Sequence, residues 1–555
     1  MALKITASIL ILLGIFLRLY QLDTLPGGIF SDEISIAVNA KTIAENGVDE
    51  YGRTFPFGFE SLSDYKMPLY IYLTAGVYKI LGPIVLTVHM VAAISSVISI
   101  FLLGYFTYIL FPRKKNLFYY AMISIAFCFL HIHFSRIAYE TMLSTTFLLI
   151  YLIALYQTIH YPTEKKWLII GSIGIIFSLW SYYAARFIIP VFTFLVCLVC
   201  LYRIEKNKKL VMRNIVIYLL VTTLAFIPAL LGANVDKRPA SYLLIDVKGQ
   251  TLIEKIFSKM QSIAASFLWM FNLEFLFQKG DVFAYRHGTK EVGIYPSLFV
   301  VPYLVAVVQL LKIYSIKNFS IVYISLFALI ASLPSALTSG VPYAPRLLPM
   351  LIPFSLLIAY GMYYSIEFIN KQKLFAKATI YIVIAIIFVY QILSYSHIYF
   401  IHFKKTSLPE FPVAPVQLGE EVKNIHKTEP GMPIYFLGGK SCHNWGHDDL
   451  HLWYFANLPN EAMIIWNNLY REKRYNTVGS PFDAYDSIQQ PRFSFSSIVM
   501  NPSEYEIKQA IKGAYIIRCG YHLPTIDLSG EKIMKVYYMD TLEHTDPFYV
   551  MTRKT

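Results

Sequence analysis

The alternation of long apolar runs with short polar breaks predicts a helical membrane protein. Runs of about 18 apolar residues, enough to cross a bilayer as a helix, recur from residue 4 to about residue 400 and then stop. The expected spans are 4–20, 84–111, 117–134, 139–158, 167–183, 187–202, 214–232, 295–313, 319–337, 346–366 and 376–400. We therefore expect an all-α polytopic bundle of about eleven helices (1–400), followed by a soluble domain (401–555).

Composition agrees with this reading. The 555 residues are 56% hydrophobic and 15% charged, with a mean hydropathy of +0.51, which excludes an ordinary soluble protein. The first span runs from Lys4 into Arg18 with no small-residue cleavage site, which favours a retained anchor over a removed signal peptide.

The positions of Lys and Arg predict the orientation. Five basic loops (112–116, 164–166, 203–213, 312–317 and 371–377) alternate with loops poor in basic residues. Because cytoplasmic loops accumulate Lys and Arg, we expect a multi-pass protein of the plasma membrane with a cytoplasmic N-terminus and an extracytoplasmic C-terminal domain. These loops hold fifteen basic residues, so the net charge of +13 does not indicate a nucleic-acid partner.

Three regions are then extracytoplasmic: a first loop (21–83), a later loop (233–294) and the tail (401–555). In the first loop, "SDEISIAVNAKTIAENG" predicts a helix with Ser31 as its N-cap and Gly47 as its stop. A polar link follows, and then a short helix at the membrane surface is expected from Pro68 to Gly82.

The tail alternates between strand and helix patterns. Apolar bursts predict strands at 433–439, 513–520, 532–539 and 548–553, and helical patterns occupy 449–458 and 502–513. This alternation is typical of a small α/β domain.

Two adjacent carboxylates, Asp32 and Glu33, stand out in the first loop. Acidic residues in the first turn of a helix interact favourably with its dipole, by about 0.3 to 1 kcal/mol, so they have a purely structural explanation. The same loop also contains Asp64, Tyr65 and Lys66, which brings groups of both signs to the water boundary, as a sugar site requires.

The first loop and several later motifs together resemble a known family. An anchor span, an acidic pair and "DYKMPLYIYL" are similar to the GT-C superfamily of lipid-carrier-dependent glycosyltransferases, in the branch of protein O-mannosyltransferases and aminoarabinose transferases. The resemblance continues through "HIHFSRIAYET", "WSYYAARFIIP", "FLFQKGDVFAYRHG" and "PYAPRLLPMLIPFSLLIAYG", over about residues 5–365. Met67 replaces the first of two prolines common in the aminoarabinose branch.

This resemblance implies an inverting enzyme that takes a sugar from a polyprenyl phosphate at the outer membrane face. Asp32 would be the general base for an acceptor hydroxyl or amine, and Glu33 would orient it. The acceptor would be a protein, a glycolipid or a polysaccharide. Cations and polar groups implied for the phosphate and sugar are Asp64, Tyr65, Lys66, Arg136, Arg186, His287 and Arg346.

Each cation also has a simpler explanation. Arg136 could pair with Glu140 at i,i+4 spacing on one helix. Lys66, Arg186 and Arg346 could extend to the membrane interface and contact lipid headgroups, and His287 could satisfy a loop carbonyl.

The tail string "CHNWGHDDLH" suggests a metal-binding site, since His447 and His451 are spaced i,i+4 and could share one face of a helix. The string lacks the Glu of a zincin motif, however, and a loop leading to an acidic helix start explains it more simply. We therefore expect no cofactor; a divalent cation is allowed but not indicated. Cys442 and Cys519 could form a disulfide, whereas Cys128, Cys197 and Cys200 lie within spans as small apolar residues.

Two other functions remain open. A transporter or lipid-linked sugar flippase would need ionisable groups near span centres, where few occur. A polysaccharide ligase or polymerase would use the later loop with Arg286 and His287. The chain has no Gly-rich phosphate loop typical of nucleotide-driven pumps, and no "WWDYG"-type string of oligosaccharyltransferases.

Overall fold

The computed structural model describes most of the chain in two compact units. The described residues are 2–61, 64–231, 252–282, 284–313, 318–337, 342–437, 448–461, 463–465, 468, 493–495, 498–500, 507, 509–519, 531–540 and 545–554. The helical unit comprises Met1–Leu22, Met67–Tyr70 and His89–Ile401. The mixed unit comprises Asp23–Lys66, Ile71–Val88 and His402–Thr555. This division groups most of the first loop with the tail, whereas the sequence placed it within the domain 1–400.

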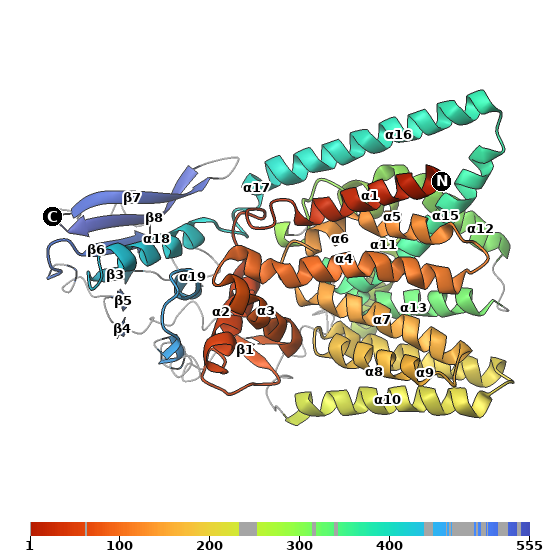
Figure 1. Ribbon diagram of the computed structural model, residues 1–555, viewed down its shortest axis with the longest axis horizontal. Coiled ribbons are helices and arrows are strands. Elements are labelled where there is room, and N and C mark those ends of the chain that lie inside the picture. The colour runs from red at the N-terminus through yellow and green to blue at the C-terminus, as the bar shows by residue number, and fades with distance from the viewer. Residues whose placement is uncertain are drawn as a thin grey trace. The chain divides into compact units, whose positions relative to one another are not determined.

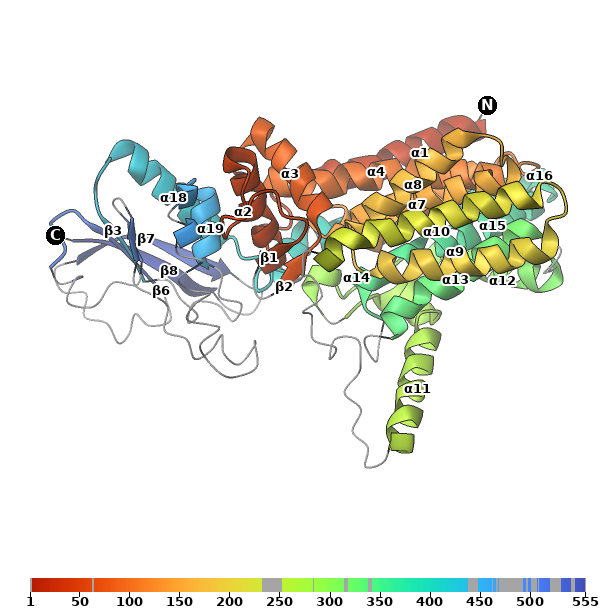
Figure 2. The same cartoon turned by 90° about the horizontal axis from the view of Figure 1, so that it is seen from below.

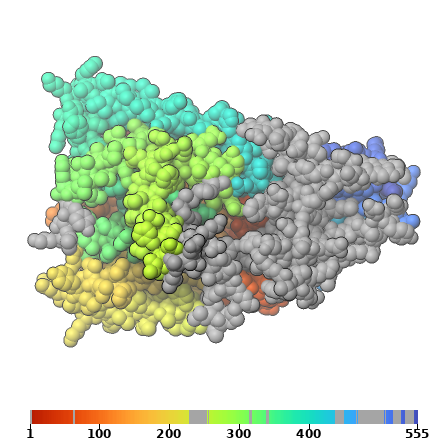
Figure 3. Space-filling view, turned by 180° about the vertical axis from the view of Figure 1, so that it is seen from behind, coloured from red at the N-terminus to blue at the C-terminus, as the bar shows by residue number. Residues whose placement is uncertain are grey.

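In the helical unit most helices are long and lie side by side (Figure 1). Its α-helices include α1 (Ala2–Leu19), α4 (Val85–Leu110), α5 (Leu117–Ala126), α6 (Phe129–Phe134), α7 (Glu140–His160), α8 (Lys165–Leu179), α9 (Ala184–Arg203), α10 (Lys208–Leu231), α11 (Leu252–Trp269), α12 (Val300–Ile313), α13 (Phe319–Ala336), α14 (Ala344–Leu347), α15 (Leu351–Asn370) and α16 (Leu374–His397). Seen from behind, α16 runs along one side of this unit and α10 along the other (Figure 3).

Within the described part of the chain, seven helical stretches are long and apolar enough to cross a membrane. They contain α4, α7, α9, α10, α13, α14 with α15, and α16. The other four expected ranges hold α1, α5 with α6, α8, and α12. The chain is thus mostly helical as expected, and the count of eleven spans remains a prediction.

The expected span 117–134 is broken between α5 and α6 by a buried arginine from another helix. Arg18 of α1 donates hydrogen bonds from its guanidinium to the carbonyls of Ile125 (2.9 Å) and Ala126 (2.8 Å). The last carbonyl groups of a helix have no partner within it, so this arginine satisfies the end of α5 and stabilises the break.

Small residues set the closest helix contacts. A Cβ on Gly361 of α15 would lie 1.7 Å from the carbonyl oxygen of Pro302 in α12, so only glycine permits this approach.

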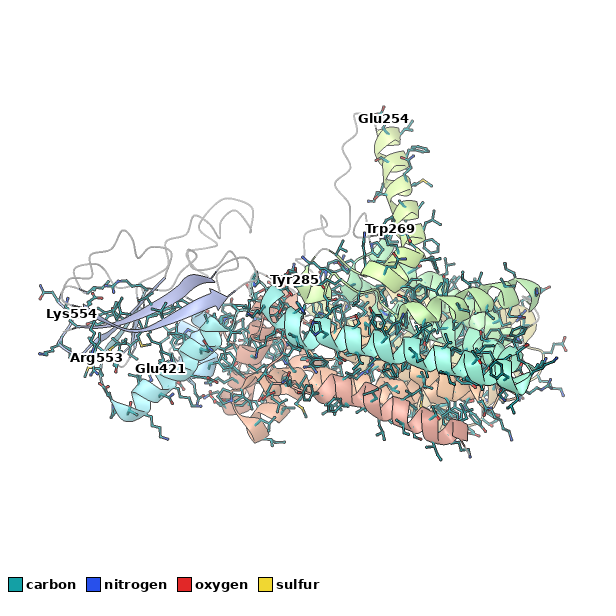
Figure 4. All side chains as sticks on the ribbon, turned by 90° about the horizontal axis from the view of Figure 1, so that it is seen from above. Glu254, Trp269, Tyr285, Glu421, Arg553 and Lys554 are labelled. Atoms are coloured by element: carbon teal, nitrogen blue, oxygen red, sulfur yellow. The ribbon has the colours of Figure 1, made fainter. Side chains whose placement is uncertain are left out.

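By contrast, α11 extends away from the other helices of this unit, with Glu254 near its far end and Trp269 near its base (Figure 4).

The mixed unit contains a six-stranded sheet with strand order β4-β5-β3-β6-β8-β7. Its strands are β3 (Ile434–Leu437), β4 (Phe493–Phe495), β5 (Ile498–Met500), β6 (Tyr515–Cys519), β7 (Glu531–Asp540) and β8 (Thr545–Lys554). β3 pairs in parallel with β5 and β6, and the other pairs are antiparallel. The four strands predicted in the tail are confirmed as β3, β6, β7 and β8; β4 and β5, three residues each, are too short to show an alternating pattern.

Two helices accompany this sheet. α18 (Ala414–Thr428), which the sequence pattern did not predict, packs against one face of the sheet and contacts β7 (Figure 2). α19 (Asp448–Phe455) confirms the helix predicted at 449–458. The helix predicted at 502–513 lies mostly outside the described residues.

The first loop forms α2 (Ser31–Asn46), the hairpin of β1 (Phe59–Ser61) and β2 (Asp64–Lys66), and α3 (Pro68–Leu81). Both helices end, as predicted, before glycines in the left-handed conformation, Gly47 (φ 71°) and Gly82 (φ 73°). The hairpin was not predicted, because the polar link shows no alternating pattern.

A buried lysine joins α2 to the tail within the mixed unit. The ammonium of Lys41 donates to the carbonyl of Leu458 (2.9 Å), to Oδ1 of Asn460 (2.7 Å) and to the carboxylate of Glu45 (2.9 Å). Burial lowers the pKa of Lys41, and the Glu45 carboxylate partly offsets this effect. The buried ammonium of Lys41 therefore attaches the tail to the first loop, because burial leaves it no water to bond to in place of these acceptors.

We expect Lys41→Met to destabilise the mixed unit by about 3 kcal/mol, because it leaves buried acceptors unpaired. Hydrogen exchange of the full protein should become faster in both α2 and α19. Lys79→Met, which removes an exposed lysine of α3, is the matched control. Unchanged protection in the Lys41 variant would show that these contacts do not hold the loop to the tail.

Candidate active site

The first turn of α2 gives its two carboxylates different environments. The N-cap position is Phe30, so the prediction that Ser31 caps the helix is wrong; Ser31 is the first helical residue. Oε2 of Glu33 accepts a hydrogen bond from the backbone N–H of Phe30 (3.0 Å), and Glu33 is fully buried. This geometry is half of a capping box, in which the third helical residue reaches back to the cap. Glu33 therefore supports the helix start.

Asp32 faces outward by comparison, with 36% of its side chain exposed. Its Oδ1 lies 2.7 Å from the ammonium of Lys66, whose side chain is only 4% exposed. Hydrogen bonds between charged groups are short and roughly twice as strong as neutral ones. The pair therefore fixes the orientation of a carboxylate that remains accessible.

The β1–β2 hairpin positions Lys66. Lys66 is the last residue of β2 and lies opposite Phe59 of β1, and Tyr65 lies opposite Glu60. Tyr65 is buried, as is Lys66. Asp64 pairs with Ser61 through the backbone, and its side chain lies outside the described part of the structure. The structure thus brings Asp32, Glu33, Tyr65 and Lys66 into one unit and joins Asp32 directly to Lys66.

Arg186 lies in the first turn of α9 in the helical unit. One of its guanidinium nitrogens lies 3.1 Å from the sulfur of Met67, the residue that follows Lys66 in the chain. Its guanidinium carbon lies 4.8 Å from the ring centre of Tyr183 and 5.9 Å from that of Phe226. Aromatic rings from the N-cap of α9 and from α10 hold this half-buried cation in place.

Arg346 and His287 share an aromatic neighbour in the helical unit. The ring of Tyr343 lies 5.0 Å from the guanidinium carbon of Arg346 and 4.9 Å from the His287 ring. Nδ1 of His287 lies 3.1 Å from a carboxylate oxygen of Asp281, and the same oxygen accepts from the backbone N–H of Ala344 at the start of α14 (3.3 Å). Both the carboxylate of Asp281 and the imidazole of His287 are almost fully buried.

The sequence did not single out Asp281 or Tyr343 as site residues. Both lie in motifs that carried the family resemblance, "FLFQKGDVFAYRHG" and "PYAPRLLPM", and each contacts a predicted site residue of its own motif: Asp281 contacts His287, and Tyr343 contacts Arg346. Asp281, His287 and His133 border a cavity of about 20 Å³ in the helical unit. That volume accommodates about one water molecule.

Arg136 has a structural task that the sequence did not reveal. Its guanidinium donates to the carbonyls of Leu17 (3.1 Å), Arg18 (3.1 Å) and Gln21 (2.9 Å), and the residue is fully buried. Leu17 and Arg18 lie in the last turn of α1 and Gln21 follows it, so Arg136 caps the end of that helix. Arg136 lies between α6 and α7, and Glu140 is the first residue of α7, so the two residues do not share a helix as the i,i+4 spacing suggested.

The described residues give no support to the hypothesis of a metal site in the tail. Among them, no group of three or more His, Cys, Asp or Glu could hold a metal ion. His443 and His447 lie outside these residues, as does Cys442 of the expected disulfide. His451 is buried in α19, and its Nε2 lies 3.1 Å from the carbonyl of Ile29. Cys128, Cys197 and Cys200 are free thiols, as expected.

No protein-family model matches the chain, and comparison with curated proteins finds no match. Solved structures are similar in fold. ArnT from Cupriavidus metallidurans bound to undecaprenyl phosphate is 10% identical with a TM-score of 0.53, over 99% of this chain and 97% of that one. The oligosaccharyltransferase of Archaeoglobus fulgidus in its apo form is 11% identical with a TM-score of 0.51, over 94% of this chain and 70% of the other. The chain therefore has the GT-C fold that its motifs indicated.

Proposed function

We propose that the chain is an integral-membrane glycosyltransferase that moves a sugar from a polyprenyl phosphate to an acceptor hydroxyl or amine, with inversion at the anomeric carbon. The fold shared with ArnT, whose structure contains undecaprenyl phosphate, supports the choice of donor class. The predicted orientation puts the reaction on the extracytoplasmic face. The sugar and the acceptor are left open.

The observation that carries this proposal is the pairing of accessible Asp32 with buried Lys66 at 2.7 Å. A carboxylate that only favoured the helix dipole would need no buried ammonium beside it. Removing a lysine from water costs free energy, and the position of Lys66 next to an accessible carboxylate favours a site with two functions: a cation for a phosphate group and a carboxylate for an acceptor proton.

In the proposed reaction, the acceptor oxygen or nitrogen attacks the anomeric carbon while the bond from that carbon to the phosphate oxygen breaks. The electron pair of the broken bond leaves with the polyprenyl phosphate. Asp32 takes the acceptor proton, and attack opposite the leaving group inverts the centre. Glu33 holds the helix start from which Asp32 projects.

The departing phosphate needs cations because negative charge grows on it as the sugar leaves. We assign Lys66 this role first: phosphate binding to its ammonium would compete with Asp32 and release the carboxylate to act as base. Arg186, Arg346 and His287 are further candidates, and Tyr65 and Asp64 adjoin Lys66 in the chain. Arg136 is not assigned to the phosphate, because its guanidinium is buried against the end of α1.

Lys66 variants test the donor assignment. Lys66→Met should weaken binding of undecaprenyl phosphate by about 10- to 100-fold, the usual loss for a hydrogen bond to a charged group, whereas Lys66→Arg should retain most of it. Binding would be measured by native mass spectrometry of the purified protein, with Lys79→Met as the control. Equal affinity in wild type and Lys66→Met would contradict the assignment.

A lipid-linked sugar flippase would also bind this lipid, so binding alone does not separate the two functions. A flippase moves the donor intact between leaflets, and a transferase cleaves the bond from sugar to phosphate. Release of polyprenyl phosphate from a polyprenyl-phosphate sugar is therefore the discriminating product.

A further inference from the structure

An apolar groove lies on the helical unit where α15 packs against α12 and α13. Its volume is about 160 Å³, and its walls include Leu310 of α12, Ala328 of α13 and Phe354 of α15. Two of its lining side chains, Ser325 and Tyr360, carry a polar group. The stretches that contain α13 and α15 are long and apolar enough to cross a membrane, so we expect this groove to be accessible to lipid acyl chains.

One end of the groove is next to a cation in a tyrosine cage. The ammonium of Lys114 lies 5.5, 4.2 and 4.4 Å from the ring centres of Tyr360, Tyr363 and Tyr364. It also donates to the hydroxyl of Tyr364 (3.1 Å). Attraction between an ammonium and aromatic faces keeps the side chain in this position.

The cage and the groove share residues. Tyr360 belongs to both, and its ring lies 5.9 Å from Phe111, which also lines the groove. The backbone N–H of Lys114 donates to the carbonyl of Phe111 (2.9 Å), so a single turn of chain connects the cation to the groove wall.

Lys114 is not paired directly with an acid in the described ranges of the chain, although the carboxylate of Glu367 accepts a hydrogen bond from Tyr363, one of the cage rings. Its neighbours Arg113 and Lys115 are exposed. Lys312, two residues beyond Leu310 at the end of α12, is exposed as well. An anion at this end of the groove would meet the caged ammonium and the exposed basic side chains of Arg113, Lys115 and Lys312.

We propose that this groove and Lys114 bind an anionic phospholipid, with one acyl chain in the groove and the phosphate at the caged lysine. Basic pockets beside membrane helices bind such headgroups on the cytoplasmic side. Residues 112–116 form one of the five basic loops predicted to be cytoplasmic, so this lipid belongs to the inner leaflet, whereas the proposed donor reacts at the outer face. The site goes beyond the proposed function and does not depend on it.

The test uses the purified full chain in nanodiscs of phosphatidylcholine alone or mixed with phosphatidylglycerol. After release into the gas phase, native mass spectrometry should show wild-type protein retaining phosphatidylglycerol in preference to phosphatidylcholine. Lys114→Met should lower this preference about fivefold, because one cation near the headgroup is removed. Lys206→Met, an exposed lysine of another predicted cytoplasmic loop, should leave it unchanged.

A second variant tests the groove separately from the charge. Ala328→Trp fills the groove and should reduce retention to a similar extent, whereas Leu329→Trp, on the neighbouring exposed position, should not. Thermal unfolding in the two nanodiscs gives an independent readout: phosphatidylglycerol should stabilise wild type and Leu329→Trp more than it stabilises Lys114→Met or Ala328→Trp. Equal retention in all four variants, or displacement of the bound phospholipid by undecaprenyl phosphate at equal concentration, would overturn the proposal.

Discussion

Asp32→Asn is expected to lower the rate of sugar transfer by about 10²- to 10⁴-fold, the usual contribution of a positioned general base. The amide has nearly the shape of the carboxylate, and its oxygen can still accept from Lys66. It cannot take the acceptor proton at neutral pH, so the loss should appear in turnover. Release of polyprenyl phosphate from a polyprenyl-phosphate sugar measures this rate.

Two controls separate chemistry from folding. Asp23→Asn removes an exposed carboxylate from the same unit and should leave the rate unchanged. Thermal stability of the Asp32 variant and its affinity for undecaprenyl phosphate should both stay close to wild type. Turnover near the wild-type rate in Asp32→Asn would remove Asp32 from the mechanism.

Arg136→Met is expected to lower the free energy of unfolding by about 3 kcal/mol or more, because each buried carbonyl left unsatisfied costs about 1 to 3 kcal/mol. The substitution leaves three backbone carbonyls at the end of α1 without their donor. Hydrogen exchange should accelerate in α1, and the unfolding temperature in detergent should fall. Arg213→Met, which removes an exposed arginine of α10, is the control.

This prediction also decides between two roles for Arg136. If the residue binds the lipid phosphate as the sequence motif suggested, the variant would lose affinity for undecaprenyl phosphate and keep its stability. The capping role predicts the opposite pattern, with a clear loss of stability in the absence of any lipid.

Local patterns were sufficient for much of the fold. The ends of α2 and α3 at glycines, and the apolar runs of β3, β6, β7 and β8, depend on residues close together in the sequence. Periodicity and turn residues were therefore sufficient to predict these elements. The break between α5 and α6 was not predictable in this way. It depends on Arg18, which is 107 residues from one of the carbonyls that it satisfies.

In the candidate site, too, the sequence predicted which residues matter but not their long-range contacts. Asp32 and Glu33 were found as an acidic pair at a helix start, but their division into an exposed carboxylate and a buried capping group depends on packing. Lys66 was proposed from its motif, and its contact with Asp32 spans 34 residues. Arg136 looked like a phosphate ligand because sequence cannot show that a charged group is enclosed by carbonyls from another helix.

The central claim is that the chain catalyses inverting transfer from a polyprenyl-phosphate sugar. The most direct test is to incubate the purified protein with donors of defined anomeric configuration and candidate acceptors, and to determine the product configuration by NMR. The proposal predicts release of polyprenyl phosphate and a product of opposite anomeric configuration. Transfer with retention, or passage of the intact donor across a vesicle membrane without release of polyprenyl phosphate, would contradict it.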